Sequence, residues 1–155
     1  MSSRLSFAIA PTKFRADIEQ AVRQEFHTEL GTSCIYPVAV SFKTLTGWSE
    51  PLVMIYDTGA TVTLLPARYA DALAVKHSVP IILGGIVPGA QLRASLARLT
   101  LRLEDLGGQI SPEIPAWVAI AERDDVPPIL GMIDISPTHR LEVNPEEGKF
   151  YLEFR

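Results

Sequence analysis

The chain has 155 residues, of which 47% are hydrophobic and 21% are charged, and its formal net charge is −4. This length allows one domain with a substantial core, and this composition excludes an intrinsically disordered chain. The net charge and the scattered basic residues argue against a nucleic-acid surface as the main function. The single cysteine, Cys34, cannot form an internal disulfide, and its strand-like neighbours predict a packing role.

The first third of the chain predicts a strand followed by a helix. A half-buried strand is indicated by the alternation of Leu5, Phe7 and Ile9. From residue 12 to residue 31 the period becomes helical, with Thr12 suited to cap the start and Gly31 the end. Apolar residues recur there along one stripe, at Phe14, Ile18, Val22, Phe26 and Leu30. We expect this stripe to dock on the domain, because soluble helices normally bury such a face; a partner-binding helix is the alternative.

From Cys34 onward the pattern is that of β-structure. Residues 34–43 and 51–56 predict two strands that form a hairpin through the turn at Gly47. Residues 66–75 predict a short helix with Pro66 in its first turn. Residues 79–105 predict a long hairpin, whose second arm alternates between apolar and polar residues.

The last third of the chain predicts further strands. Residues 114–121 form one of them, with Trp117 expected in the core, and the charged residues 122–125 form a solvated loop. Residues 127–131 predict an apolar strand that ends at Gly131, and Pro137 would end a brief helical turn after it. Residues 139–154 predict a closing hairpin. No segment is apolar and long enough to span a bilayer, so we expect a cytoplasmic protein with no membrane partner.

Asp57 lies where a buried strand ends, in the sequence Asp57-Thr58-Gly59-Ala60. An ionised aspartate on an apolar strand is costly unless a partner stabilises it. In one interpretation the turn itself satisfies the carboxylate through backbone hydrogen bonds. In the other, Asp57 meets a partner that the local sequence does not contain.

Three motifs in this order resemble those of the retropepsin-like (retroviral-type) aspartic proteases, in their bacterial single-domain form. They are Asp57-Thr58-Gly59-Ala60, the glycine-containing hairpin from Ile82 to Ala90, and Ile129-Leu130-Gly131. The resemblance covers residues 34–155. It implies a mainly β, closed-barrel-like acid protease fold with one or two short helices and an N-terminal helical extension. We therefore predict a strand and helix extension over residues 1–32 and a protease domain over residues 33–155.

The resemblance also implies an aspartic endopeptidase with Asp57 as its catalytic residue. Such enzymes use two close carboxylates that share one proton and activate a water molecule. The chain contains one such motif, so the economical partner is Asp57 of a second chain in a homodimer. Thr58 and Gly59 would support this active site, and the hairpin from Gly84 to Gly89 would be a flap. Contacts with a peptide or protein substrate are expected from Ala60, Gly84, Gly85, Ile86 and Val87.

Other interpretations remain open at the level of sequence. Met132 and Ile133 separate the Ile129-Leu130-Gly131 motif from Asp134, where the family often has a polar residue directly after the glycine. The rival functions are a weakly active or inactive dimeric peptide-binding scaffold, and a monomeric barrel that binds a small molecule. No metal site or cofactor is predicted, because the histidines, expected at surfaces or helix caps, share no metal-binding spacing: His27, His77 and His139.

Overall fold

The computed structural model describes residues 3–13, 15–31, 33–87, 90–133, 135 and 138–155, with only the backbone of residues 85–87 and 90. Its first half contains the elements β1 (Ser3–Ala8), β2 (Ala10–Thr12), α1 (Ala16–Phe26), β3 (Ser33–Ile35), β4 (Pro37–Thr44), β5 (Gly47–Trp48), β6 (Leu52–Tyr56), β7 (Thr63–Leu65) and α2 (Tyr69–Ala72). Its second half contains β8 (Val79–Val87), β9 (Ala90–Glu104), β10 (Ile114–Ala121), β11 (Ile129–Leu130), β12 (His139–Asn144) and β13 (Lys149–Phe154).

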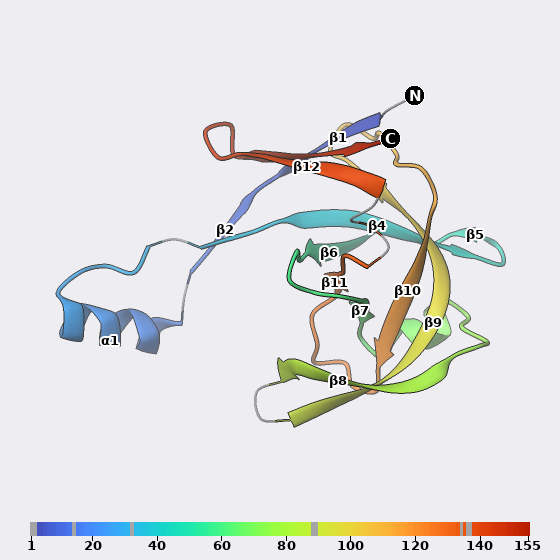
Figure 1. Cartoon of the computed structure of the whole chain (residues 1–155), viewed down its shortest axis with the longest axis horizontal. Helices are drawn as coiled ribbons and strands as arrows, with labels where there is room; N and C mark the ends of the chain where they lie inside the picture. Colours follow the sequence, from blue (N-terminus) through green and yellow to red (C-terminus); the bar gives the residue numbers. More distant parts are fainter. Residues whose placement is uncertain (1–2, 14, 32, 88–89, 134, 136–137) are drawn as a thin grey trace.

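The main sheet has the strand order β5-β4-β6-β11-β7-β10-β9-β8 (Figure 1). An additional pairing between β4 and β9 joins the two sides of this sheet and closes six of its strands into a barrel. Closure pairs the strands of the barrel on both sides, whereas β5 and β8 lie outside it and remain the end strands of the sheet. The predicted mainly β, closed-barrel fold is confirmed.

The hairpins predicted from sequence are also confirmed. Strand β4 pairs with β6 in antiparallel register, and β8 pairs with β9. Strand β9 alternates as its sequence predicts, because Leu101 and Leu103 are fully buried while Arg98 on the opposite face is exposed. The closing hairpin is formed by β12 and β13.

A second sheet, with the order β1-β13-β12, packs against the barrel and shares its core. Strand β1 pairs with β13 along its whole length. Its side chains Leu5 and Phe7 are buried, and the ring of Phe7 stacks on that of Phe150 with the centroids 5.2 Å apart. Residues 3–8 therefore belong to the same core as the strands that follow residue 33.

The predicted N-terminal helix exists, but it is shorter than expected, and the described residues of the chain do not bury its apolar face. Thr12 lies in β2, which pairs with β3, and the residue that precedes the helix is Arg15. His27 ends the helix in the left-handed conformation, so the predicted caps at Thr12 and Gly31 are wrong. None of the helical residues is buried, and Figure 1 shows α1 standing away from the barrel.

Two predictions about single side chains are wrong. Trp117 is 39% exposed, because the alternation along β10 turns it outward while Ala116 and Val118 point inward. Cys34 is exposed on β3, away from the barrel core. The predictions that concern Phe14, Pro88, Gly89, Asp134 and Pro137 lie outside the described residues.

Candidate active site

Asp57 follows directly after β6, at a point where three strands meet. The short strand β11 lies between β6 and β7, parallel to the first and antiparallel to the second. The backbone N–H of Asp57 donates to the carbonyl of Leu130, at 3.2 Å. The loop between β6 and β7 is therefore held by a segment more than 70 residues later in the chain.

Gly131 explains why the Ile129-Leu130-Gly131 motif ends in glycine. A Cβ atom at this position would overlap the carbonyl carbon and oxygen of Val62 and would come within 2.7 Å of the Thr63 nitrogen. The Gly131 N–H also donates to the buried hydroxyl of Thr63, at 3.1 Å. The close approach continues in two backbone hydrogen bonds, from Met132 N–H to the Ala60 carbonyl at 2.9 Å and from Ile133 N–H to the Thr61 carbonyl at 2.8 Å.

The carboxylate of Asp57 is only partly satisfied by its own turn. Oδ1 accepts a hydrogen bond from the Gly59 N–H at 2.9 Å, and within the described residues Oδ2 has no donor. Asp105 shows what complete local satisfaction looks like, since its carboxylate accepts from the backbone N–H groups of Ser6, Gly107 and Gln109. Asp57 thus caps its own turn through Oδ1, while Oδ2 can still accept a hydrogen bond from a group in the space in front of it.

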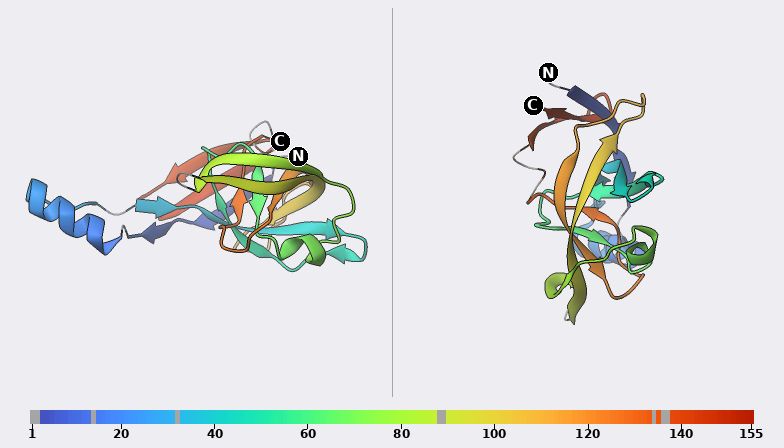
Figure 2. Two further views of the ribbon diagram at one scale, coloured as in Figure 1. Left: turned by 90° about the horizontal axis from the view of Figure 1, so that it is seen from below. Right: turned by 90° about the vertical axis from the view of Figure 1, so that its right-hand side faces the viewer.

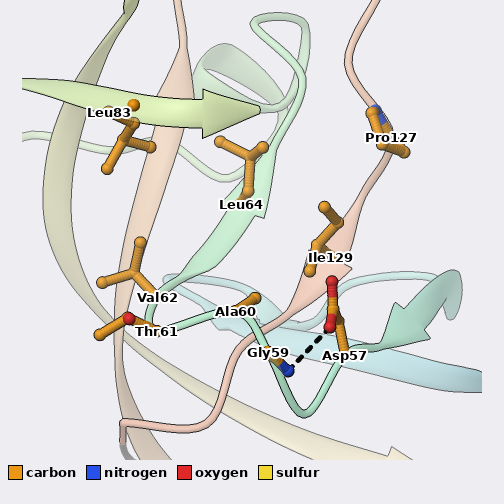
Figure 3. A pocket seen from close by; sticks show the side chains of 10 residues that line it. Asp57, Gly59, Ala60, Thr61, Val62, Leu64, Leu83, Pro127 and Ile129 are labelled. Carbon is orange, nitrogen blue, oxygen red and sulfur yellow. Dashed lines mark hydrogen bonds between the residues drawn. The ribbon is translucent and has the colours of Figure 1, made fainter. Parts of the chain in front are cut away.

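That space is a cleft of about 500 Å³ beside Asp57 (Figure 3). Strand β8 contributes Leu83 and Gly84 to its wall, opposite the loop that carries Asp57. Beyond Asp57 the lining is largely apolar and comes from the loop after β6, from β7 and from the segment that enters β11: Gly59, Ala60, Thr61, Val62, Leu64, Pro127 and Ile129. The size and the mixture of one carboxylate with apolar walls are typical of ligand sites.

The cleft brings together several residues that the sequence singled out. Asp57, Gly59 and Ala60 line it, and Gly84 joins them from a strand far away in the sequence. Thr58 is exposed at the tip of the turn. The predicted contacts of Gly85, Ile86 and Val87 stay predictions, because the structure describes only the backbone there. Sequence reasoning missed the apolar walls, although the apolar residues after Asp57-Thr58-Gly59-Ala60 were a signal for Val62 and Leu64.

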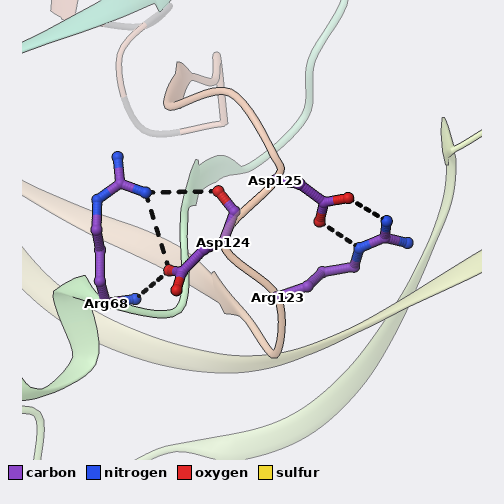
Figure 4. A network of polar contacts seen from close by, with 4 residues as sticks. All are labelled: Arg68, Arg123, Asp124 and Asp125. Atoms are coloured by element: carbon purple, nitrogen blue, oxygen red, sulfur yellow. Dashed lines mark hydrogen bonds and ion pairs between the residues drawn. The ribbon is translucent and has the colours of Figure 1, made fainter.

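Pro127 reaches the cleft from the charged loop between β10 and β11 (Figure 3). The charged side chains of this loop and Arg68 form the polar network in Figure 4. Asp124 accepts a hydrogen bond from the backbone N–H of Arg68 at 2.7 Å and ties this loop to the segment before α2. Arg123 and Asp125 form a two-bonded ion pair, which lowers the pKa of Asp125 through the hydrogen bond from Arg123. Both groups are exposed, as expected for a solvated loop, so the pair contributes little to stability.

Tyr56, the residue before Asp57, is held in place by a hydrogen bond to His139. The Tyr56 hydroxyl and His139 Nε2 are 2.6 Å apart, and His139 Nδ1 is 2.7 Å from the carbonyl of Ile135. A carbonyl only accepts, so Nδ1 carries the proton and Nε2 accepts from the tyrosine. Burial raises the pKa of Tyr56 to about 12 and lowers the pKa of His139. The expectation that His139 lies at the surface or at a helix cap is wrong.

The whole architecture is similar to that of a solved protease. The crystal structure of a retropepsin-like aspartic protease from Rickettsia conorii superposes with a TM-score of 0.54 and 12% sequence identity, over 99% of this chain and 92% of that one. The fold is the retropepsin-like fold. No protein-family model and no curated protein sequence matches the chain.

The retropepsin-like fold places the end of β6, where Asp57 begins its turn, beside the inserted strand β11 and opposite β8. Within the described residues, histidine, cysteine, aspartate and glutamate side chains form no group of three or more that could hold a metal ion. Neither described helix has the length and apolar character needed to cross a membrane. Among the described residues that line the cleft, the charged group is the Asp57 carboxylate, and most of the others are apolar.

Proposed function

We propose that the protein is an aspartic endopeptidase whose active site forms when two chains bring their Asp57 carboxylates together. The observation that carries this proposal is the position of Asp57, which faces the cleft with an oxygen that its own turn leaves unsatisfied. The retropepsin-like fold supports it, because that fold is shared with a known aspartic protease. One chain supplies one such carboxylate, and a two-fold axis would supply the second.

The chemistry follows from placing two like charges close together. Two adjacent carboxylates cannot both ionise easily, so the pair holds one proton. The ionised carboxylate takes a proton from a water molecule, whose oxygen attacks the carbonyl carbon of the peptide. The protonated carboxylate donates its proton to the carbonyl oxygen, which gives a tetrahedral diol. The carboxyl group that received the water proton then passes it to the amide nitrogen and the C–N bond breaks. One diol hydroxyl gives its proton to the other carboxylate as the carboxylic acid product forms, so the pair again holds one proton. The reaction needs one ionised and one protonated carboxylate in the pair. The rate of cleavage should therefore pass through a maximum at acidic pH.

The substrate that this cleft suits is an extended peptide with apolar side chains. Strand β8 is the last strand of its sheet, so a peptide could bind along it by backbone hydrogen bonds. The register between β8 and β9 is interrupted between Leu83 and Val87, which is the kind of irregularity found beside active sites. The apolar walls formed by Val62, Leu64 and Ile129 favour apolar side chains next to the scissile bond.

The test is cleavage of a peptide library by the wild-type protein and by Asp57→Asn, from about pH 3 to pH 8 so that carboxylate titration is bracketed. Asn keeps the side-chain size and can still accept from the Gly59 N–H, so the variant should fold and dimerise but lose cleavage. Asp71→Asn, an exposed aspartate on α2, is the matched control and should cleave like the wild type. Cleavage by Asp57→Asn at the wild-type rate would refute the proposal. A stable dimer of the wild type that binds peptides without cleaving them would favour the scaffold function, and a monomer with one bound small molecule would favour the third interpretation.

A further inference from the structure

The N-terminal arm, defined here as β2, α1 and β3, carries an apolar helix face that the described part of the chain leaves largely exposed. Ile18 is 42% exposed and Phe26 is 69% exposed, and Val22 between them is half-buried. A spacing of four residues places these three side chains along one face of α1. We call this face the α1 stripe.

The charged side of the same helix is the one that faces the rest of the arm. Glu19 and Arg23 line a hollow of about 190 Å³ together with residues 12–13 before the helix and 29–31 after it. Arg23 also lies 3.8 Å from Glu29 in the segment after the helix. The arm thus contacts the polar flank of α1 beside the α1 stripe, and it leaves Ile18 and Phe26 exposed.

Helix α1 has little to stabilise it within one chain. It spans 11 residues, a length at which isolated helices are marginal in water. Arg15 provides no side-chain cap at its start, and its end requires a non-glycine residue, His27, at a φ of 52°. Since most helical stability in proteins comes from packing of an apolar face, this helix needs a surface to pack on.

The direction of the arm indicates which surface that is. In Figure 1 the arm leaves the barrel toward the same side as the end of β6, after which Asp57 follows, and as the end of β8 and the start of β9. The left view of Figure 2 shows the arm extending along the same direction from below. A second copy that brings its Asp57 next to the first must approach from that side, where the arm projects.

We propose that the arm of each chain wraps around the second copy and that the α1 stripe packs on its surface. The proposal rests on the homodimer of the proposed function and adds the element that would hold it together. By two-fold symmetry both arms make the same contact, so each side chain of the stripe contributes to the dimer interface twice, once from each chain. Docking of the arm would also order α1, which couples helix formation to dimer formation.

The first test is the dissociation constant of the dimer, measured by sedimentation equilibrium on the full chain with Asp57→Asn as the background to prevent self-cleavage. Ile18→Gln together with Phe26→Gln removes the ends of the stripe but keeps a good helix former at each position. Truncating two interface side chains, each counted twice, should weaken the dimer by about 30-fold or more. The matched control is Gln20→Ala with Gln24→Ala, on the exposed opposite face of α1, which should leave the dissociation constant unchanged.

The second test is amide hydrogen exchange of residues 16–26 at protein concentrations below and above the dissociation constant. If the arm docks on the second copy, these amides exchange rapidly in the monomer and slowly in the dimer. Equal exchange at both concentrations, or a double Gln variant that dimerises like its control, would overturn the arm contact while leaving the endopeptidase proposal intact. Docked arms together with a wild-type protein that dimerises but cleaves no peptide would uphold the arm contact and refute the enzyme. A chain that stays monomeric at every concentration would overturn both.

Discussion

Replacing Gly131 by alanine tests whether the close approach of two backbones holds the Asp57 loop in place. A Cβ at this position cannot be accommodated by a side-chain movement, because the atoms that it would overlap belong to the backbone of Val62 and Thr63. The segment after β11 must therefore move away from the loop. That movement also strains the hydrogen bonds that Gly131, Met132 and Ile133 make to the loop.

The expected loss of stability follows from these contacts. Forcing one extra methyl group into a packed interior costs about 1–3 kcal/mol. Weakening the bond between the Gly131 N–H and the Thr63 hydroxyl costs about 1 kcal/mol, and the two neighbouring backbone bonds together cost about 1 kcal/mol more. The free energy of unfolding should therefore fall by about 3–5 kcal/mol. This is a large part of the roughly 5–15 kcal/mol by which a typical domain is stable. The melting temperature should fall by on the order of 10 °C.

The assay is urea unfolding followed by circular dichroism, with Gly31→Ala as the matched control. No atom lies within 4 Å of a Cβ built at Gly31, and its φ is not in the left-handed region, so the same substitution there should change stability by less than about 0.5 kcal/mol. If Gly131→Ala unfolds at the same urea concentration as Gly31→Ala, the argument from backbone contact is refuted. Loss of cleavage in Gly131→Ala under conditions where it is folded would show that the contact positions Asp57.

Three further predictions concern the proposed dimer, the cleft and the pH dependence of stability. Specific activity per chain should fall on dilution as the dimer dissociates, whereas constant activity in a demonstrated monomer would contradict the shared site. Gly84→Val should impair cleavage, because Gly84 lines the cleft. The melting temperature should stay nearly unchanged, because a Cβ built at Gly84 meets no atom within 4 Å. Unchanged kinetics would show that β8 is not part of the substrate site. Burial lowers the pKa of His139, so its contribution to stability is complete above about pH 6.5 and is lost as the pH falls from there through the folded value. His139→Gln should flatten this acidic loss in urea unfolding at several pH values, and an unaltered pH dependence would show that His139 does not cause it.

Local sequence patterns determined most of the strands and the identity of the candidate site. Alternation along β9 is visible in the sequence because a strand turns successive side chains to opposite faces. The same rule turns Trp117 outward because Ala116 and Val118 are buried, but which face of this strand is the inner one became known only from the structure. Asp57 stood out because a carboxylate at the end of an apolar strand is costly without a partner.

The tertiary structure alone decided how distant segments meet. The pairing of β4 with β9 closes the barrel, and the insertion of β11 between β6 and β7 places Gly131 against Val62; neither has a signature within a short window of sequence. The N-terminal helix also shows that a local pattern does not identify the contact partner of an element. Its apolar stripe predicts that something covers it, but which surface does so depends on where the arm points. Periodicity reports which face of an element avoids water, whereas contacts between elements far apart in the chain depend on the packing of the whole fold.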